Sequence, residues 1–573
     1  MRKFLLGILC GFLLAALTVA VLGLVLVRLG DQRPAVPDEA VLQLRLEGEI
    51  GEAARAEIPF PFGDGLARPT VHEVWTALKF AAQDNRIKAV VLRPRGVAAG
   101  WAKLAELRGV IAEFRRSGKP VLAWLTNPGA REYYLSTAAD KIYLVEEDRL
   151  DLKGIRAELT YFKGTLDRLG IQMEVEHMGR YKDAGDIYSR TGSTPETREV
   201  VNAILDGVYA DLVSAIAQGR KKTPEEVRRL LDDGPFLAPQ ALRAGLVDGL
   251  LYEDQFQAEL KQRTGKDHRA ISLRHYAREA LEAQRGPQLA LVTGEGPILR
   301  GGMEGLGDEQ LILSENFAKV LRRVGDDPAI QGAILRIDSP GGDAIASDDI
   351  LREVKLLRQK KPVVISMSDV AASGGYYIAA SGDPIVAYPT TITGSIGVVY
   401  GKPNLKGLYD KLGVNKEIIT RGRYAAVDTL YGPMTEAARA KLREGLKQTY
   451  DVFLKRVAEA RGTSPEAIEP LAQGRAWLGS EAHARQLVDH LGGLDKAVEL
   501  LKQKAKIAAG ESVRLIAYPP RPNFLLKYLA RTPEAAAEAR LRRQLREYGL
   551  ELPPSALCRG GVWRLMPFQL DIR

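Results

Sequence analysis

The stretch Ala89-Val-Val-Leu-Arg93 recurs as Gly332-Ala-Ile-Leu-Arg336, and the spacing between the two copies is kept over a long block. Residues 87–182 align with residues 330–425 at a constant offset of 243. A pair of adjacent tyrosines and a Gly-Arg-Tyr triplet recur at that same offset. A chain of 573 residues is too long for one hydrophobic core. The repeat therefore predicts two homologous domains in tandem.

Each copy alternates short β-branched runs with amphipathic helical stretches. In the second copy, two apolar strands over 333–337 and 363–367 flank a helical pattern over 350–357. The first copy repeats this with strands over 89–92 and 121–124. Such alternation is typical of parallel βαβ units with right-handed crossovers. We therefore expect two α/β domains.

Patterning also suggests bounds for the parts of the chain. Alternating strand patterns begin near Val41 and Leu289, and the stretch that separates the copies is charged and helix-prone. The predicted organisation is an N-terminal anchor (1–28), a tether (29–40), a first repeat (41–251), a connecting segment (252–288), a second repeat (289–505) and a C-terminal tail (506–573).

The N-terminus has the pattern of a single membrane-spanning helix. Arg2 and Lys3 precede an uncharged, mostly apolar run over 4–27, which Arg28 ends. That run is long enough to cross a bilayer, whereas the apolar core of a cleavable signal peptide is only about 7–15 residues long. We expect an uncleaved anchor with its N-terminus in the cytoplasm and the body on the outer side. Cleavage near Ala20 is the alternative.

Composition excludes several classes of function. The net charge of +9 is modest for this length, and no basic cluster is interleaved with aromatic residues, which disfavours nucleic-acid binding. Cys10 and Cys558 are the two cysteines, and no Cys/His cluster has metal-ligand spacing. We therefore expect neither a disulfide nor a metal, and no cofactor.

The two copies have lost different polar residues. At the constant offset, Ser373 of the second copy faces Ala130 of the first, and Lys182 of the first copy faces Ala425 of the second. Ser395 likewise faces an apolar leucine in the first copy. Reciprocal loss of this kind indicates a serine–lysine pair divided between two duplicated domains.

Three segments of the second copy could carry chemistry. Asp338-Ser-Pro-Gly-Gly-Asp343 follows a strand and precedes a helix, so its glycine amides could bind an oxyanion or only form a tight turn. Ala371-Ala-Ser-Gly-Gly-Tyr-Tyr377 places Ser373 near a helix N-terminus, where its hydroxyl could attack a substrate or only cap the helix. Thr393-Gly-Ser-Ile-Gly397 supplies a further hydroxyl.

A serine nucleophile needs a base, and no histidine lies in these segments. His177 is the nearest competitor of Lys182 and is better explained as a structural residue. An exposed lysine is protonated at neutral pH, but burial at a domain interface brings a lysine pKa toward about 7–8. Lys182 could instead be solvated, or paired with Asp183 or Asp186.

Taken together, the motifs SPGG, ASGGYY and TGSIG in one half and GRYKDA in the other resemble the long, tandem-repeat form of the signal peptide peptidase A (protease IV) family. The resemblance extends from the anchor to about residue 505. It implies two Clp-protease/crotonase-like domains in a membrane-tethered serine peptidase that acts on remnant signal peptides and other unfolded hydrophobic segments. It further implies a homotetramer.

The resemblance also implies a role for each matching residue. Ser373 is then the nucleophile, Lys182 the general base and Ser395 the residue that assists the lysine. Gly341 or Gly342 would stabilise the oxyanion beside Gly374. Two rival functions stay open on the sequence: crotonase-like acyl-CoA chemistry without a nucleophile, and a non-catalytic membrane scaffold.

Overall fold

The computed structural model describes residues 36–53, 69–302, 311–520, 561–566 and 572, with isolated positions 7, 11, 14, 17 and 18. The predicted anchor (1–28) lies almost wholly outside these residues and stays a prediction. Among the described residues, one helix, Pro195–Arg220, is long and apolar enough to span a bilayer, but 50% of its apolar window is buried inside the protein. A core helix has this pattern too.

The first repeat contains a parallel sheet with strand order β8-β4-β3-β2-β1-β9. Its central strands are apolar runs buried on both faces, as parallel sheets covered by helices require. The strands are β1 (Ala40–Glu49), β2 (Ile87–Ala98), β3 (Val121–Leu125), β4 (Lys141–Leu144), β8 (Gly249–Leu250) and β9 (Arg269–Ser272), and β5 (Arg149–Leu150) pairs separately with β7 (Phe236–Leu237). The helices are α2 (Val71–Gln83), α3 (Trp101–Arg115), α4 (Ala130–Ser136), α5 (Lys163–Leu169), α6 (Asp186–Ser189), α7 (Pro195–Arg220), α8 (Pro224–Asp233), α9 (Ala238–Arg243), α10 (Glu253–Thr264) and α11 (Leu273–Ala283).

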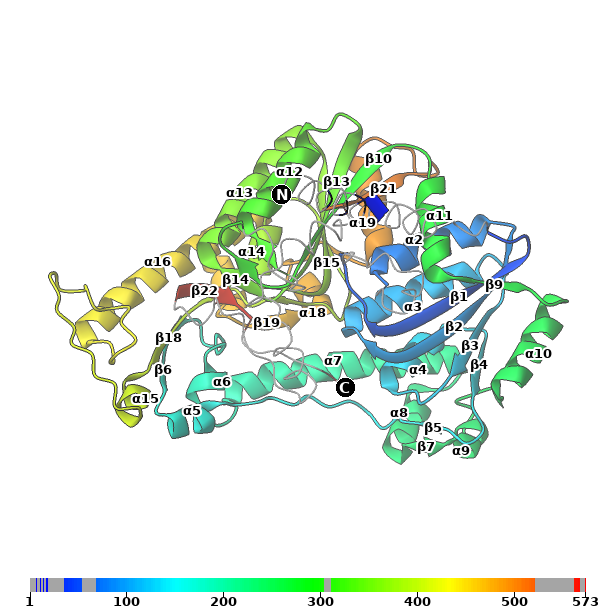
Figure 1. The fold of residues 1–573 in the computed structure, drawn as a ribbon, viewed down its shortest axis with the longest axis horizontal. Coiled ribbons are helices and arrows are strands. Elements are labelled where there is room, and N and C mark those ends of the chain that lie inside the picture. The colour runs from blue at the N-terminus through cyan, green and yellow to red at the C-terminus, as the bar shows by residue number, and fades with distance from the viewer. Residues whose placement is uncertain are drawn as a thin grey trace.

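The second repeat contains the equivalent sheet, with order β19-β17-β15-β13-β10-β21 and with β16 and β20 branching from β15. The strands are β10 (Gln288–Glu295), β13 (Ile330–Ser339), β15 (Val363–Ala372), β16 (Ile385–Ala387), β17 (Ile392–Gly394), β19 (Ala476–Leu478), β20 (His490–Leu491) and β21 (Arg514–Tyr518). The helices are α12 (Ser314–Asp326), α13 (Ala344–Lys360), α14 (Gly374–Ala379), α15 (Lys406–Lys411), α16 (Glu436–Arg461), α17 (Pro465–Ile468), α18 (Gly479–Ala484) and α19 (Leu494–Lys504), with a 3₁₀ turn at Glu469–Leu471. Figure 1 shows the two repeats side by side, with α7 running beneath both.

The two repeats also match after residues 182 and 425, where the constant offset ends, because they contain equivalent ion pairs. Helices α7 and α16 each have 26 residues, and each ends in an arginine. Arg220 contacts Asp248 at 2.8 Å, and Arg461 contacts Asp489 at 2.5 Å in the second repeat. The two α/β repeats expected from the sequence are therefore present.

The segments outside the predicted repeat bounds contribute to the sheets. The predicted connector (252–288) forms α10, β9 and α11, and β9 pairs with β1. Strand β21, from the start of the predicted tail, pairs with β10. The domain bounds themselves stay predictions.

A third sheet joins the repeats, with order β12-β11-β14-β22-β18-β6. Its remaining strands are β6 (Gln172–Met178), β11 (Ile298–Leu299), β12 (Ile312–Leu313), β14 (Gly341–Asp343), β18 (Val398–Asn404) and β22 (Gly561–Leu565). Strand β6 of the first repeat lies antiparallel to β18 of the second, with Met178 opposite Val398. The pairing places the residues that follow β6 beside the residues that precede β18.

Buried charges also cross between the repeats. Arg336 on β13 is fully buried and contacts Glu52 at 2.8 Å and Glu106 at 2.6 Å, both from the first repeat. Nearby, Lys103 of the first repeat lies 2.6 Å from Asp338 of the second. Buried ions are stable only when paired in this way, so these contacts fix how the repeats dock.

Candidate active site

The backbone around Ser373 is a sharp strand-to-helix turn. Strand β15 ends at Ala372, Ser373 has φ 55° and ψ −112°, and α14 begins at Gly374. A positive φ is strained for a residue with a side chain. The strain is held by two hydrogen bonds, in which Ser373 N–H donates to Gly394 O and Tyr377 N–H donates to Ser373 O, both at 2.8 Å. The turn that presents the nucleophile in α/β-hydrolases is of this kind.

Lys182 reaches this turn from the other repeat of the same chain. It follows β6 by four residues, and the antiparallel pairing of β6 with β18 carries it to the start of β18. Its Nζ lies 2.8 Å from Ser373 Oγ, 2.8 Å from Ser395 Oγ and 2.8 Å from Ser395 O. All three side chains are 0% exposed. The structure thus brings together the three side chains that the sequence singled out.

The three contacts fit either protonation state of the Lys182 amine. A charged amine donates one N–H to Ser373 Oγ and one to each oxygen of Ser395. A neutral amine, with two N–H donors and one lone pair, donates to both oxygens of Ser395 and accepts from the Ser373 hydroxyl. The geometry therefore allows a proton to pass between Ser373 Oγ and Lys182 Nζ.

The alternative interpretations of these residues do not match the geometry. Among the described residues, the Ser373 hydroxyl makes no capping hydrogen bond to α14, because it points to Lys182. Asp183 accepts a hydrogen bond from Thr197, and Asp186 lies 3.7 Å from Arg190. Burial raises the pKa of both carboxyl groups.

The competing base is placed elsewhere. His177 lies on β6, exposed, with its Nδ1 3.0 Å from Gly179 O. In the second repeat, Ala425 lies exposed in a loop, and Ala130 begins α4 of the first repeat. Those two positions hold alanine, so they cannot form a second serine–lysine pair.

The Gly341-Gly342 loop lies against Gly374, the residue that follows Ser373. A Cβ placed on Gly374 would be 3.0 Å from the amide nitrogen of Gly342 and 3.1 Å from Cα of Gly341. The Gly341 N–H donates to Ser339 Oγ at 3.1 Å, which occupies it. Asp343 caps α13 through its side chain, so the turn is anchored on its helix side.

Sequence reasoning missed a loop, residues 473–475, that packs against Lys182. Gln473 O accepts from Tyr181 N–H at 2.7 Å, and Arg475 O accepts from Ser395 N–H at 2.7 Å. Between them, Gly474 has φ +75°, and a Cβ there would lie 2.6 Å from Lys182 Cβ. This loop sets the position of Lys182 relative to Ser395. Its signal in the sequence is Gly474, which recurs as Gly234 in the first copy.

Gly474→Ala is expected to lower activity more than stability. The new Cβ meets the backbone and Cβ of Lys182, so the lysine must shift, and a displacement of about 1 Å costs about 100-fold in rate. Gly462→Ala is the matched control, because Gly462 also has a positive φ, +63°, but open space around it. We expect similar losses of melting temperature in both variants and a large loss of kcat/KM in Gly474→Ala alone. Equal activities would show that the loop does not position Lys182.

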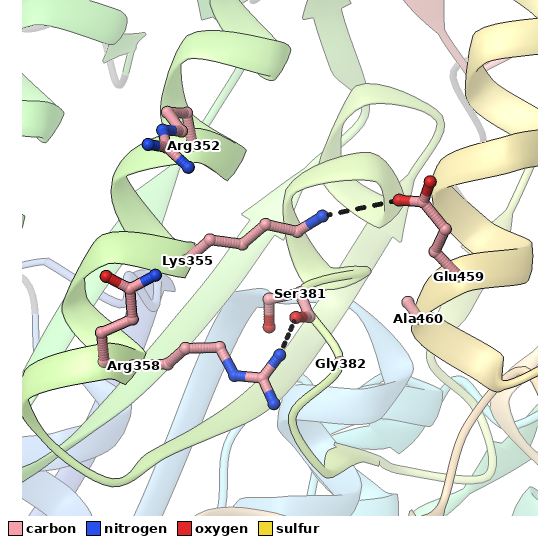
Figure 2. Close-up of a pocket in the computed structure, with 8 residues that line it drawn as sticks. Arg352, Lys355, Arg358, Ser381, Gly382, Glu459 and Ala460 are labelled. Atoms are coloured by element: carbon pink, nitrogen blue, oxygen red, sulfur yellow. Dashed lines mark hydrogen bonds and ion pairs between the residues drawn. The ribbon is translucent and has the colours of Figure 1, made fainter.

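A cavity of about 480 Å³ lies between α13 and α16, away from the group formed by Ser373, Lys182 and Ser395. In Figure 2, Lys355 is directed toward Glu459, 3.9 Å away, and Arg358 toward the Ser381 carbonyl oxygen, 2.8 Å away. Its lining includes neither Ser373 nor Lys182.

A buried serine in contact with a buried lysine, on a strained turn beside backbone amides, is the arrangement of a serine hydrolase. Comparisons with known proteins narrow that class. Two segments of the chain, 113–267 and 355–508, match the family model described as peptidase family S49. The chain belongs to this family and is a serine peptidase, as the motif resemblance implied.

Two named relatives agree with that assignment, and a solved structure shows a weaker likeness that adds nothing to it. The chain is 35% identical to "Serine protease SPPA, chloroplastic" of Arabidopsis thaliana, over 83% of this chain and 71% of that protein. It is 29% identical to "Protease 4" of Haemophilus influenzae, over 87% of this chain and 86% of that protein. A solved structure titled as a membrane-bound stomatin-specific protease, 1510-N, aligns with 43% of this chain and 99% of its own at 16% identity and a TM-score of 0.26.

Proposed function

We propose that Ser373 is the nucleophile of this peptidase and Lys182 its general base. The contact of Lys182 Nζ with Ser373 Oγ and with both oxygens of Ser395 carries the proposal. Ser395 holds the amine in the orientation that leaves its lone pair facing Ser373. Duplication followed by reciprocal loss explains why each chain has one such site.

In the first half of the reaction, Ser373 Oγ attacks the carbonyl carbon of the peptide bond while its proton passes to Lys182 Nζ. The tetrahedral oxyanion accepts hydrogen bonds from backbone N–H groups, for which we assign Gly374 and Gly342. Gly342 is preferred to Gly341 because the Gly341 N–H donates within its own loop to Ser339, whereas Gly342 pairs with Arg564 of β22, a separate segment of the chain. The lysine returns the proton to the leaving amine, and an acyl-enzyme ester remains.

In the second half, water loses a proton to neutral Lys182 and attacks the ester carbonyl. The same amides stabilise the second oxyanion. When it collapses, the bond to Ser373 Oγ breaks and Lys182 returns the proton to that oxygen. The lysine thus acts as base and acid in turn, which requires it to stay uncharged between turnovers.

The substrates we propose are remnant signal peptides and other unfolded hydrophobic segments. Every reacting side chain is buried, so a folded surface cannot reach the site. The apolar run at the N-terminus supports a body tethered to the outer side of the cell membrane, close to where such peptides remain after cleavage. A homotetramer is part of the proposal through the motif resemblance.

A serine-directed fluorophosphonate tests the nucleophile directly. In the detergent-solubilised full chain, we expect one label per chain, on the peptide that contains Ser373, and none in Ser373→Ala. Ser381→Ala is the matched control, since Ser381 is also buried but contacts Asp383. Peptide hydrolysis by a chain labelled only at another serine would contradict the proposal.

A further inference from the structure

The C-terminal strand lies in a backbone slot beside the candidate active site. Strand β22 pairs antiparallel with β14 on one side and with β18 on the other. Trp563 is paired with both neighbours, opposite Asp343 on β14 and opposite Val399 on β18. Each flanking strand therefore has an edge that an extended peptide can pair with.

This slot leads to the glycine loop next to Ser373. Leu565 lies opposite Gly341 and Arg564 opposite Gly342, and Met566 N–H donates to Pro340 O at 2.7 Å. The amide nitrogen of Gly342 would lie 3.0 Å from a Cβ placed on Gly374. An extended chain paired with β14 must pass over the loop that we assign to the oxyanion, and β22 occupies that path.

The end of the chain reaches the first repeat at the equivalent place. Ile572 O accepts hydrogen bonds from Arg131 Nη2 at 2.9 Å and from Trp101 Nε1 at 3.2 Å. Ile572 also forms an isolated antiparallel bridge with Ala157, and its side chain is buried in the core of that repeat. Ile572 is therefore held by specific contacts and not only by proximity.

Comparison of the two repeats identifies the site in the first repeat that Ile572 contacts. At the offset of 243, Ala157 corresponds to Tyr400, and Tyr400 pairs antiparallel with Val562 of β22. Arg131 corresponds to Gly374, and it directly follows Ala130, the counterpart of Ser373. The parallel bridge Gly129–Asp151 likewise corresponds to Ala372–Gly394. Ile572 thus pairs, in the first repeat, with the equivalent of the β18 edge that β22 pairs with in the second.

We propose that the degenerate site of the first repeat has kept its peptide-binding role and holds the C-terminal end of the chain, so that β22 is set across the active slot as an intrasteric strand. In this repeat an arginine replaces the small residue after the nucleophile position, and its guanidinium binds a backbone carbonyl. The proposal rests on the proposed function, because it assigns the slot between β14 and β18 to the substrate. An incoming peptide must displace β22 to pair with the same edges.

Two variants test this proposal: a substitution directly after β22 and a truncation that removes Ile572. Met566→Pro removes the N–H that bonds Pro340 O, and Met566→Ala, which keeps it, is the matched control. A chain that ends at Met566 keeps β22 but lacks Ile572. We expect Met566→Pro and the shortened chain to raise kcat/KM for a short unstructured peptide about three- to tenfold, the equivalent of one or two backbone hydrogen bonds. Wild-type values in both would overturn the proposal.

A binding measurement separates this proposal from the proposed function. The probe is a fluorescent peptide with the sequence of residues 561–573, added to a chain that ends at Gly560 and carries Ser373→Ala. Saturable binding by anisotropy, weakened at least about tenfold by Arg131→Ala, supports the two-site strand even if the wild type hydrolyses no peptide. Lack of saturation, or binding that Arg131→Ala leaves unchanged, overturns it even if Ser373 proves to be the nucleophile.

Discussion

Ser373→Ala and Lys182→Met are each expected to lower kcat/KM for peptide hydrolysis by at least about 10⁴-fold, because the nucleophile and its base act as one unit. Methionine is preferred to alanine at position 182 because that side chain is fully buried, and a shorter one would leave a cavity. The double variant should be no worse than either single variant. Initial rates on an unstructured fluorogenic peptide give the measurement.

The losses of activity in these variants bear on the mechanism only if the variants stay folded. We expect near-native melting temperatures for both variants and wild-type activity for Ser381→Ala, which changes a buried serine outside the dyad. Additive losses in the double variant, or residual turnover above about 1% of the wild type in either single variant, would rule out the dyad.

Arg336→Met is expected to cost about 3–5 kcal/mol in free energy of unfolding, since it leaves Glu52 and Glu106 buried without their cation. Chemical denaturation at neutral pH gives the measurement. Arg93→Met is the matched control at the equivalent position of the first repeat, where the arginine contacts the exposed Glu253. That change should cost about 1 kcal/mol or less.

The pH dependence of Arg336→Met gives a second check. Burial raises the pKa of Glu106 even in the presence of Arg336, whereas the pKa of Glu52 is lowered because the charge of Arg336 opposes the effect of burial. Without this cation the pKa of both carboxyl groups must rise. A carboxyl group with a raised pKa binds more protons in the folded state than in the unfolded state, so the defect should shrink as pH falls below neutral. A defect that is constant from pH 7 to about 5 would mean that lost packing, not charge, explains it.

Much of the candidate site was predictable because duplication provides an internal comparison. Neither the serine turn nor the lysine segment is specific alone, but Ala130 and Ala425 identify their partners by reciprocal loss. The β-branched runs and helical spacing were also sufficient to predict two parallel α/β repeats, since those patterns depend on local burial periodicity. The loop around Gly474 was not predicted, because its role depends on a contact with a segment almost three hundred residues away.

The sequence by itself determined the two repeats, the motif of each and the pairing of Ser373 with Lys182, since these follow from residue identity and from a fixed offset. Only the tertiary structure decided that both residues meet within one chain, because this depends on β6 pairing antiparallel with β18 across the repeats. It also decided that the Gly341-Gly342 loop lies against Gly374, and that β22 lies in the slot. The paired strands β6 and β18 are more than two hundred residues apart, and local burial patterns do not reveal a pairing across such a distance.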